Sequence, residues 1–197
     1  MNYSIEKLIK SFPRKLESEV EKVLKIIDSN YKYSTYEGQN EKLDNFISNE
    51  FQFLKIENEI LEIPIRIYFD EPKLQLEENL TEDQKIILNC IFLRHHNGYI
   101  REERLKKLAN KNEYWIYTFV FQLIGEYVYE ILEYINLNLS EEKLYFFTKI
   151  ATENPKYFQL IENRMISYWN EYHRRKFPKL SSYVGFIIIE KIKKNVA

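Results

Sequence analysis

The stretch from Thr81 to Ile135 constrains the fold most, because it holds the longest segments in which apolar residues recur at helical spacing. Thr81 and Gln84 match a capping box, in which a hydroxyl accepts an early main-chain amide and a side chain three residues later returns the bond. A helix is therefore predicted to begin at Thr81. The run from Ile86 to Leu93 is apolar on nearly every side, which is typical of a helix surrounded by other helices.

One predicted break and a second helix follow this helix closely. Asn97-Gly98 is expected to end it, since glycine readily takes the left-handed conformation that closes a helix. A second helix is predicted from Ile100 to Ala109, so near the first that the pair forms a helical hairpin or a right-angled corner.

The longest helix is predicted from Trp115 to Ile135. Drawn at 100° per residue, it has an apolar face and an opposite polar face. Three glutamates at i, i+4 and i+7 belong to the polar face: Glu126, Glu130 and Glu133. Such a row either forms ion pairs inside the fold, with Arg94 and Arg101 as the nearest basic candidates in sequence, or lines an open acidic groove.

Helices are also predicted on both sides of this central stretch. The N-terminal part is expected to be helical from Ser4 to Ser29, with a break at Pro13, and again from Glu41 to Ser48. The polar, tyrosine-rich segment Asn30 to Asn40 between them is predicted to be irregular. Three more helices are predicted toward the C-terminus, beginning at Ser140, at Asn154-Pro155 and at Ser181 or Ser182.

A small β-hairpin is predicted near residues 51–69, where apolar residues alternate instead of following helical spacing. Glu57-Asn58-Glu59 is its expected turn. Pro64 lacks an amide hydrogen, so its strand should lie at an edge or turn that nitrogen away from the ladder. A lone hairpin is marginally stable in water, and it must therefore cover the helical core or meet a partner. Its open edge is one candidate surface for strand addition.

The composition fits a mainly α fold, because 4 glycines and 5 prolines are few for an all-β chain with many tight turns. We expect one domain over residues 1–197, an antiparallel helical bundle or an α-solenoid-like stack. It divides into an N-terminal helical part (1–50), the hairpin (51–69) and the main helical core (81–197). The single cysteine, Cys90, lies in an apolar run, so no disulfide is expected and a reducing cytoplasm fits. The charged N-terminus lacks the apolar core of a signal peptide, and no segment has the length and apolarity of a membrane span.

Net charge is -1, which argues against a protein built mainly to hold nucleic-acid backbone. Acidic and basic blocks nevertheless alternate along the chain. This pattern is typical of neighbouring helices whose outer faces attract one another, or of a bipolar surface that docks a charged partner.

A polar group surrounds the predicted break at Asn97-Gly98 and is a candidate binding site: Arg94, His95, His96, Arg101 and Glu102. Histidines beside guanidinium groups at a helix end can hold an anion. Adjacent helical residues point about 100° apart, so the two histidines are poorly placed to share a metal ion, and no metal or cofactor is expected. The competing interpretation is structural, with cations at a helix C-terminus or paired with the glutamate row.

A second candidate site combines aromatic and basic residues near the C-terminus, the composition of a nucleic-acid patch and of a protein-interface hot spot. Its members are Arg164, Trp169, Tyr172, His173, Arg174 and Arg175. A buried tryptophan surrounded by extended basic side chains is the structural alternative.

The sequence contains no phosphate-binding loop, dinucleotide glycine motif, paired-cysteine zinc motif or serine nucleophile elbow. We therefore expect a non-enzymatic, cytoplasmic protein-interaction module, of immunity or adaptor type, that uses a charged groove or the hairpin edge. One alternative is a nucleic-acid-associated protein using the basic C-terminal region. Another is an enzyme whose His95, His96 and Glu126 converge on one open cavity. The sequence leaves the oligomeric state open.

Overall fold

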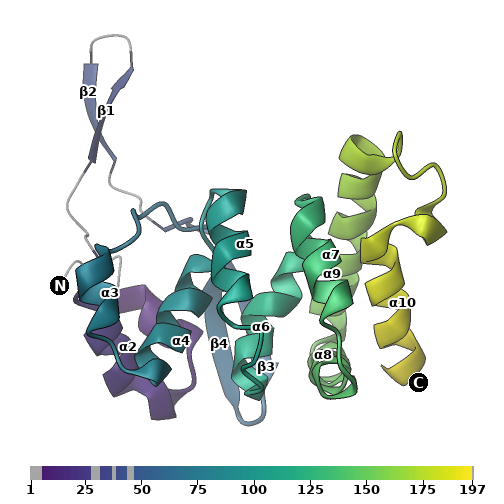
Figure 1. Ribbon diagram of the computed structural model, residues 1–197, viewed down its shortest axis with the longest axis horizontal. Coiled ribbons are helices and arrows are strands. Elements are labelled where there is room, and N and C mark those ends of the chain that lie inside the picture. The colour runs from purple at the N-terminus through teal and green to yellow at the C-terminus, as the bar shows by residue number, and fades with distance from the viewer. Residues whose placement is uncertain (1–5, 28–31, 37–38, 44–46, 197) are drawn as a thin grey trace.

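The computed structural model describes residues 6–27, 32–36, 39–43 and 47–196, and its architecture is mainly helical. Along the longest axis, α2 and α3 lie near one end, α4, α5 and α6 follow, and α10 lies at the other end, while β3 and β4 lie beside the middle helices (Figure 1). The α-helices are α2 (Glu17–Leu24), α3 (Leu74–Glu78), α4 (Glu82–Phe92), α5 (Gly98–Lys106), α6 (Tyr114–Leu123), α7 (Tyr129–Leu137), α8 (Glu141–Glu153), α9 (Pro155–Tyr168) and α10 (Val184–Val196). Short 3-10 helices span Lys7–Ser11, Arg14–Leu16 and Leu180–Ser182, and a π-helix spans Trp169–His173.

The predicted helix starts follow local capping chemistry. Thr81 and Gln84 form the complete capping box of α4. The Ser140 hydroxyl accepts the Lys143 amide at the start of α8, and Pro155 occupies the first position of α9. These confirmed starts depend on side chains next to each helix end, which is why the sequence alone predicts them.

The predicted hairpin is formed by β3 (Phe51–Ile56) and β4 (Glu59–Pro64), which pair antiparallel. Ile56 lies opposite Glu59, so Glu57 and Asn58 alone form the turn. The Ile65 amide donates to the Glu50 carbonyl at 3.0 Å. In an antiparallel ladder, hydrogen-bonded residue pairs alternate with pairs that are not hydrogen-bonded. The pair next to Glu50 and Ile65 is Phe51 and Pro64, so the Pro64 nitrogen points away from β3, as expected.

Both outer edges of this hairpin meet the rest of the chain. On the β4 side, the Ser11 hydroxyl donates to the Glu62 carbonyl at 2.6 Å. On the β3 side, the Asn154 side chain accepts the Lys55 amide at 2.7 Å and donates to the Lys55 carbonyl at 2.8 Å. Asn154 thus takes the place of a neighbouring strand at Lys55. The Phe51–Phe53 part of the edge lies beyond this contact.

The prediction for the segment before this hairpin is wrong. Lys32–Tyr36 and Gln39–Leu43 form strands β1 and β2, which pair antiparallel where we expected irregular chain and the start of a short helix. Tyrosine and threonine favour extended backbone. This preference explains the strands better than the weak apolar pattern from which irregular chain and a helix were predicted. The rest of the predicted helix that falls on residues 44–46 lies outside the described residues. The β1–β2 pair stands away from the helical body (Figure 1).

The long central helix is also divided, contrary to the prediction. The chain leaves α6 after Leu123 and starts α7 at Tyr129. Gly125 lies in the turn between them, where an added Cβ would be 3.2 Å from the main-chain oxygen of Ile161 and 3.3 Å from its Cα. The close approach of the α9 backbone favours glycine at this place, because an added Cβ would be in tight contact with it.

Asn97-Gly98 also acts differently from the prediction. The Asn97 side chain accepts the Tyr99 amide at 3.0 Å, so it caps the start of α5 and does not close α4. The expected helix from Ile100 to Ala109 is observed as α5, which begins two residues earlier.

Buried hydrophobic side chains form one cluster that extends from Leu8 in the N-terminal part to Ile192 in α10. Cys90 lies within it and is fully buried, as predicted. Within the described ranges, no helix has the length and apolarity needed to cross a membrane.

Candidate functional site

A buried cluster of charged residues lies at the centre of the fold, and we call it the arginine cluster. It consists of Glu126 and three arginines, Arg66, Arg94 and Arg101. Arg66 Nη1 lies 2.8 Å from Glu126 Oε1, and Arg94 donates to the same oxygen through Nη2. Arg101 Nε lies 2.9 Å from Glu126 Oε2, at an ion-pair distance but outside hydrogen-bond alignment. Glu126 therefore connects the chain after β4, at Arg66, with the α4–α5 region that carries Arg94 and Arg101.

The elements around the cluster explain why it forms. Arg94 follows the last turn of α4, Arg101 belongs to α5, and Glu126 lies in the turn between α6 and α7. Arg101 Nη1 also donates to the carbonyls of His95 and His96, at 2.7 and 2.9 Å. Arg101 thus holds the end of α4 and the start of α5 together.

Electrostatics keep the cluster ionised. Burial alone would raise the pKa of Glu126, but the charges of Arg94, Arg66 and Arg101 outweigh it and hold that pKa below its ordinary value. Burial lowers the pKa of Arg94 to about 10, against the opposing attraction of Glu126. Both groups are charged at neutral pH, and three cations surround one carboxylate.

The predicted glutamate row does not exist. Glu126 is 1% exposed, whereas Glu130 and Glu133 are exposed on α7. The error follows from the break at Gly125, because a helical wheel drawn through a turn assigns false faces. The row was expected either to form internal ion pairs with Arg94 and Arg101 or to line an open acidic groove. Of its three members, Glu126 alone forms the internal ion pairs.

The two adjacent histidines have different environments. His95 is buried, its Nε2 lies 2.8 Å from the Phe69 carbonyl, and its Nδ1 accepts the Asn97 amide at 3.0 Å. Burial lowers the pKa of His95, with a partial opposing effect of the Phe69 carbonyl, so the ring is neutral. His96 is exposed and stacks on Tyr68 with ring centroids 5.3 Å apart. No group of three or more histidine, cysteine or acidic side chains is arranged to hold a metal ion within the described part of the chain.

An open cleft of about 570 Å³ lies between the N-terminal ends of α5 and α7, and we call it the α5–α7 cleft. One wall carries His96, Tyr99 and Glu102, and the other carries Tyr127, Tyr129 and Glu130. His173, from the π-helix, completes it and hydrogen-bonds through Nε2 to the Tyr127 carbonyl at 2.8 Å.

The cleft brings together four of the residues that the sequence singled out: His96, Glu102, Glu130 and His173. His95, Arg94, Arg101 and Glu126 lie in the protein interior instead. The three tyrosines of the walls, Tyr99, Tyr127 and Tyr129, were not among the predicted site residues. Their signal is local: Tyr99 directly follows Gly98, and Tyr127 and Tyr129 lie two and four residues after Gly125.

The C-terminal candidate residues are divided between structural and exposed positions. Trp169 is half-buried and donates through Nε1 to the Phe177 carbonyl at 2.9 Å. Tyr172 is 60% exposed and contacts the Tyr127 ring, with centroids 5.8 Å apart. Arg174 is exposed, donates to the Asn170 side chain at 3.0 Å and lies 5.8 Å from the Trp169 ring centroid. Arg175 is exposed and Arg164 is half-buried on α9.

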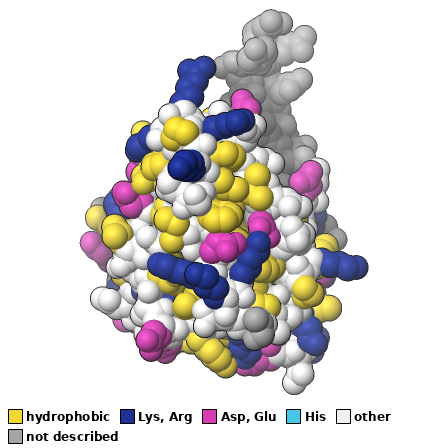
Figure 2. Space-filling model, turned by 90° about the vertical axis from the view of Figure 1, so that its right-hand side faces the viewer, with side chains coloured by type: hydrophobic (Ala, Val, Ile, Leu, Met, Phe, Trp, Pro, Cys, Tyr) yellow, Lys and Arg dark blue, Asp and Glu magenta, His cyan; other side chains and the backbone are white. Residues whose placement is uncertain are grey.

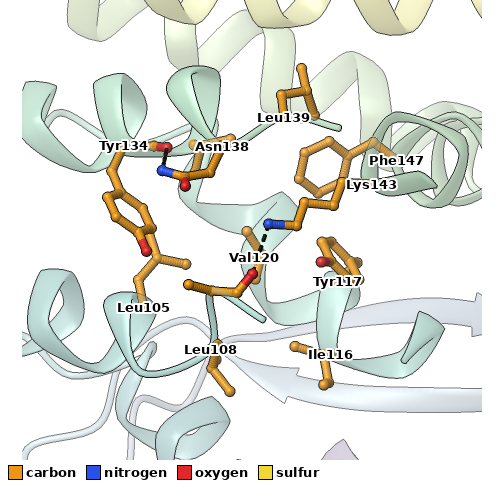
Figure 3. A pocket seen from close by; sticks show the side chains of 12 residues that line it. Leu105, Leu108, Ile116, Tyr117, Val120, Tyr134, Asn138, Leu139, Lys143 and Phe147 are labelled. Carbon is orange, nitrogen blue, oxygen red and sulfur yellow. Dashed lines mark hydrogen bonds between the residues drawn. The ribbon is translucent and has the colours of Figure 1, made fainter. Parts of the chain in front are cut away.

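A smaller apolar pocket between α5, α6, α7 and α8 differs from the cleft in size (Figure 3). Its free volume is about 30 Å³, and Lys143 Nζ, which lines it, donates to the Ala109 carbonyl at 2.9 Å. Burial lowers the pKa of Lys143. The pocket is too small for a side chain of a partner.

Hydrophobic side chains also gather on the end of the molecule where α10 lies, with basic and acidic side chains around them (Figure 2). Phe186 on α10 is half-buried. A helix at the end of a stack has a neighbour on one side only, so part of an apolar face stays open there.

No protein-family model, curated protein or solved structure matches this chain.

Proposed function

We propose that this protein is a non-enzymatic, cytoplasmic interaction module that binds a protein partner at the α5–α7 cleft. The observation that carries the proposal is the exposure of two tyrosines on opposite walls of the cleft. Tyr99 is 82% exposed and Tyr127 is 41% exposed. Tyrosine is enriched at the energetic centres of protein interfaces, because its ring offers a large contact area with little loss of side-chain freedom.

The chemistry of the walls fits the expected charged groove. Glu102 and Glu130 contribute carboxylates from the two helices, and Arg174 and Arg175 lie exposed directly after His173. Immunity and adaptor proteins are interaction modules of this kind, because both bind a specific partner without catalysing a reaction. Cys90, buried and free, fits a reducing compartment.

The hairpin edge has less support as the docking surface. Asn154 already pairs with the main chain of Lys55, and Ser11 covers the opposite strand at Glu62. The short Phe51–Phe53 segment that remains offers few main-chain groups for strand addition.

Affinity capture from the lysate of the native cell tests the proposal with two exposed tyrosines. Tyr99→Ala removes a ring from the cleft, and Tyr145→Ala is the matched control, since Tyr145 is 62% exposed on α8 and does not line the cleft. We expect one protein to be captured by the wild type and by Tyr145→Ala but lost with Tyr99→Ala. Equal capture by all three, or no specific capture by the wild type, contradicts the proposal.

A second candidate function, nucleic-acid association, is favoured by one observation. Arg174 and Arg175 are exposed after a π-helix, and Arg174 contacts an amide side chain and not a carboxylate. Free guanidinium groups beside aromatic rings bind nucleic-acid backbone in a salt-dependent way. Gel-shift titration at low salt should then weaken on replacing both arginines by alanine, whereas no shift with the wild type removes this function.

An enzyme centred on His95, His96 and Glu126 is not proposed. These side chains would have to meet in one open cavity. His96 alone lines the cleft, while His95 and Glu126 are buried in separate hydrogen-bond networks.

A further inference from the structure

We propose that the α5–α7 cleft takes up the carboxylate of an acidic side chain of the partner, at the point where the N-terminal ends of α5 and α7 meet. The inference rests on the proposed function, because it names the chemistry by which the partner is recognised. Three features of the described residues support it: the uncapped start of α7, a buried guanidinium nitrogen without a partner, and an excess of positive charge beside the cleft.

The starts of α5 and α7 lie against each other in the cleft. Gly98 is the first residue of α5, Val128 directly precedes α7, and both line the cleft. The position that a Cβ on Gly98 would take lies 3.0 Å from Val128 Cγ2. The first main-chain N–H groups of a helix have no acceptor within the helix, and its dipole places partial positive charge there. Two such ends at one cleft favour a negatively charged ligand.

The two helix starts differ in one respect. Asn97 and Val128 hold the same position before their helices and have similar backbone angles, with φ of -78° and -79° and ψ of 120° and 104°. The Asn97 side chain accepts the Tyr99 amide, whereas no side chain of the described residues caps α7. The start of α7 thus lacks the acceptor that the start of α5 has, and a carboxylate of a partner can supply it.

A buried guanidinium nitrogen beside this point has no hydrogen-bond partner. Arg101 is fully buried, and its Nη2 forms no hydrogen bond within the described part of the chain. This nitrogen lies 3.6 Å from the position that a Cβ on Gly98 would take, next to a lining residue that has no side chain to cover it. The Tyr127 ring, with its centroid 5.9 Å from Arg101 Cζ, is a weaker partner than a carboxylate oxygen. An unpaired buried N–H group is costly, so an acceptor at Gly98 is favoured.

The balance of charge beside the cleft also favours an anion. The arginine cluster contains three arginines and one glutamate, so its own members leave an excess of positive charge in a poorly solvated interior. Lys176 adds a cation, with Nζ 4.4 Å from the Tyr129 ring centroid. Of the two glutamates that line the cleft, Glu102 is already paired with Lys106 at 2.9 Å.

The other glutamate of the lining, Glu130, decides which anion fits. It lies in the first turn of α7, close to where the ligand is expected. A phosphate group carries nearly two negative charges at neutral pH, and a neighbouring carboxylate repels it more strongly than it repels a single carboxylate. A carboxylate also matches the planar edge of a guanidinium group. An acidic side chain is therefore a better fit than a phosphorylated one.

Nuclear magnetic resonance on the full chain tests the ligand chemistry directly. The probe is N-acetyl-glutamate methylamide, and the control is the glutamine analogue, which has nearly the same shape and no charge. We expect saturable shifts of the Gly98, Tyr129 and Glu130 amides and of the Arg101 side-chain signals with the glutamate probe alone. No shifts, or equal shifts with both compounds, overturn the inference. Tighter binding of inorganic phosphate than of the glutamate probe overturns the choice of a carboxylate.

Two substitutions of Val128 locate the site. Val128→Asn gives α7 the side-chain acceptor that Asn97 gives α5, so this cap competes with the probe and should weaken its binding by about fivefold or more. Val128→Ala is the matched control, because it also removes the Cγ2 contact with Gly98 but adds no acceptor. Its affinity should stay within about twofold of the wild type. Equal weakening by both variants would show that packing of Val128 determines binding, and it overturns the inference.

The same variants separate the inference from the proposed function. Loss of the partner with Val128→Asn, and its retention with Val128→Ala, supports both. A protein whose capture depends on Tyr99 but is unchanged by Val128→Asn overturns the carboxylate and leaves the docking site intact. Binding of the glutamate probe without any Tyr99-dependent capture contradicts the proposed function and leaves the ligand chemistry of the cleft in place.

Discussion

Glu126 is the residue on which the interior depends most. It is the shared carboxylate of Arg66, Arg94 and Arg101, and it is buried with two of them. Removing one member of a buried ion cluster is costly, because the desolvated charges of the others remain. The side chain therefore holds together the end of β4, the end of α4, the start of α5 and the turn before α7.

We predict that Glu126→Gln lowers the free energy of unfolding by about 3–5 kcal/mol, since glutamine keeps the shape of the side chain but not its charge. Urea denaturation measures this loss. Glu133→Gln, an exposed change on α7, should stay within about 0.5 kcal/mol of the wild type. A Glu126→Gln protein as stable as Glu133→Gln would show that the cluster does not stabilise the fold.

The pH dependence of stability provides an independent prediction at the same residue. The pKa of Glu126 in the folded protein lies below its ordinary value of 4.5. Its contribution to stability is therefore present above that value and is lost as pH falls through the folded-state pKa. The difference in unfolding free energy between wild type and Glu126→Gln should shrink below pH 4.5. A difference that stays constant down to pH 3 contradicts the assignment.

Glu57 adopts an unfavourable backbone conformation in the hairpin turn, with φ of 53°. Non-glycine residues pay about 1 kcal/mol in this left-handed region. We predict that Glu57→Gly raises the free energy of unfolding by about 0.5–1 kcal/mol. Asn58→Gly is the control: its φ is not positive, so added flexibility brings no gain. Denaturant titration in which Asn58→Gly gains as much as Glu57→Gly contradicts this explanation.

At the scale of elements, sequence and structure agree where a local signal sets a boundary. Thr81, Ser140 and Pro155 mark helix starts by chemistry that needs no tertiary contact. The disagreement at Gly125 has the opposite cause, because the turn there depends on the approach of α9, some 36 residues later, to the glycine. The burial of Glu126 followed from that turn and could not be predicted from the helical wheel.

Asn154 connects the hairpin to the helices between α8 and α9, and this link is testable. Its side chain holds the Lys55 amide and carbonyl and also donates to the Ile150 carbonyl at 3.0 Å. We predict that Asn154→Ala costs about 1–3 kcal/mol of stability and speeds hydrogen exchange at the Lys55 amide. Asn163→Ala, an exposed change within α9, should leave that exchange rate unaltered. Unchanged exchange at Lys55 in Asn154→Ala would contradict the link.

At the scale of the whole molecule, the α5–α7 cleft depends on segments that are distant in sequence. Its walls begin at Gly98 and Val128, where a Cβ added to the glycine would lie 3.0 Å from the valine Cγ2, and His173 closes it from beyond α9. Several side chains of the cleft were predicted as site residues from the sequence, but the neighbours predicted for them were wrong. Glu130 belonged to a predicted row with Glu126, and His96 to a candidate binding group with His95. Only the order in which the helices stack places Glu130 and His96 at one surface.

Hydrogen exchange on the complex tests whether a partner docks at the α5–α7 cleft. The captured protein should slow the exchange of amides at residues 98–102, 127–130 and 172–174, while residues 51–56 of β3 and the surface of α10 exchange as in the free chain. Protection confined to β3 or α10, with the cleft unchanged, would contradict the account.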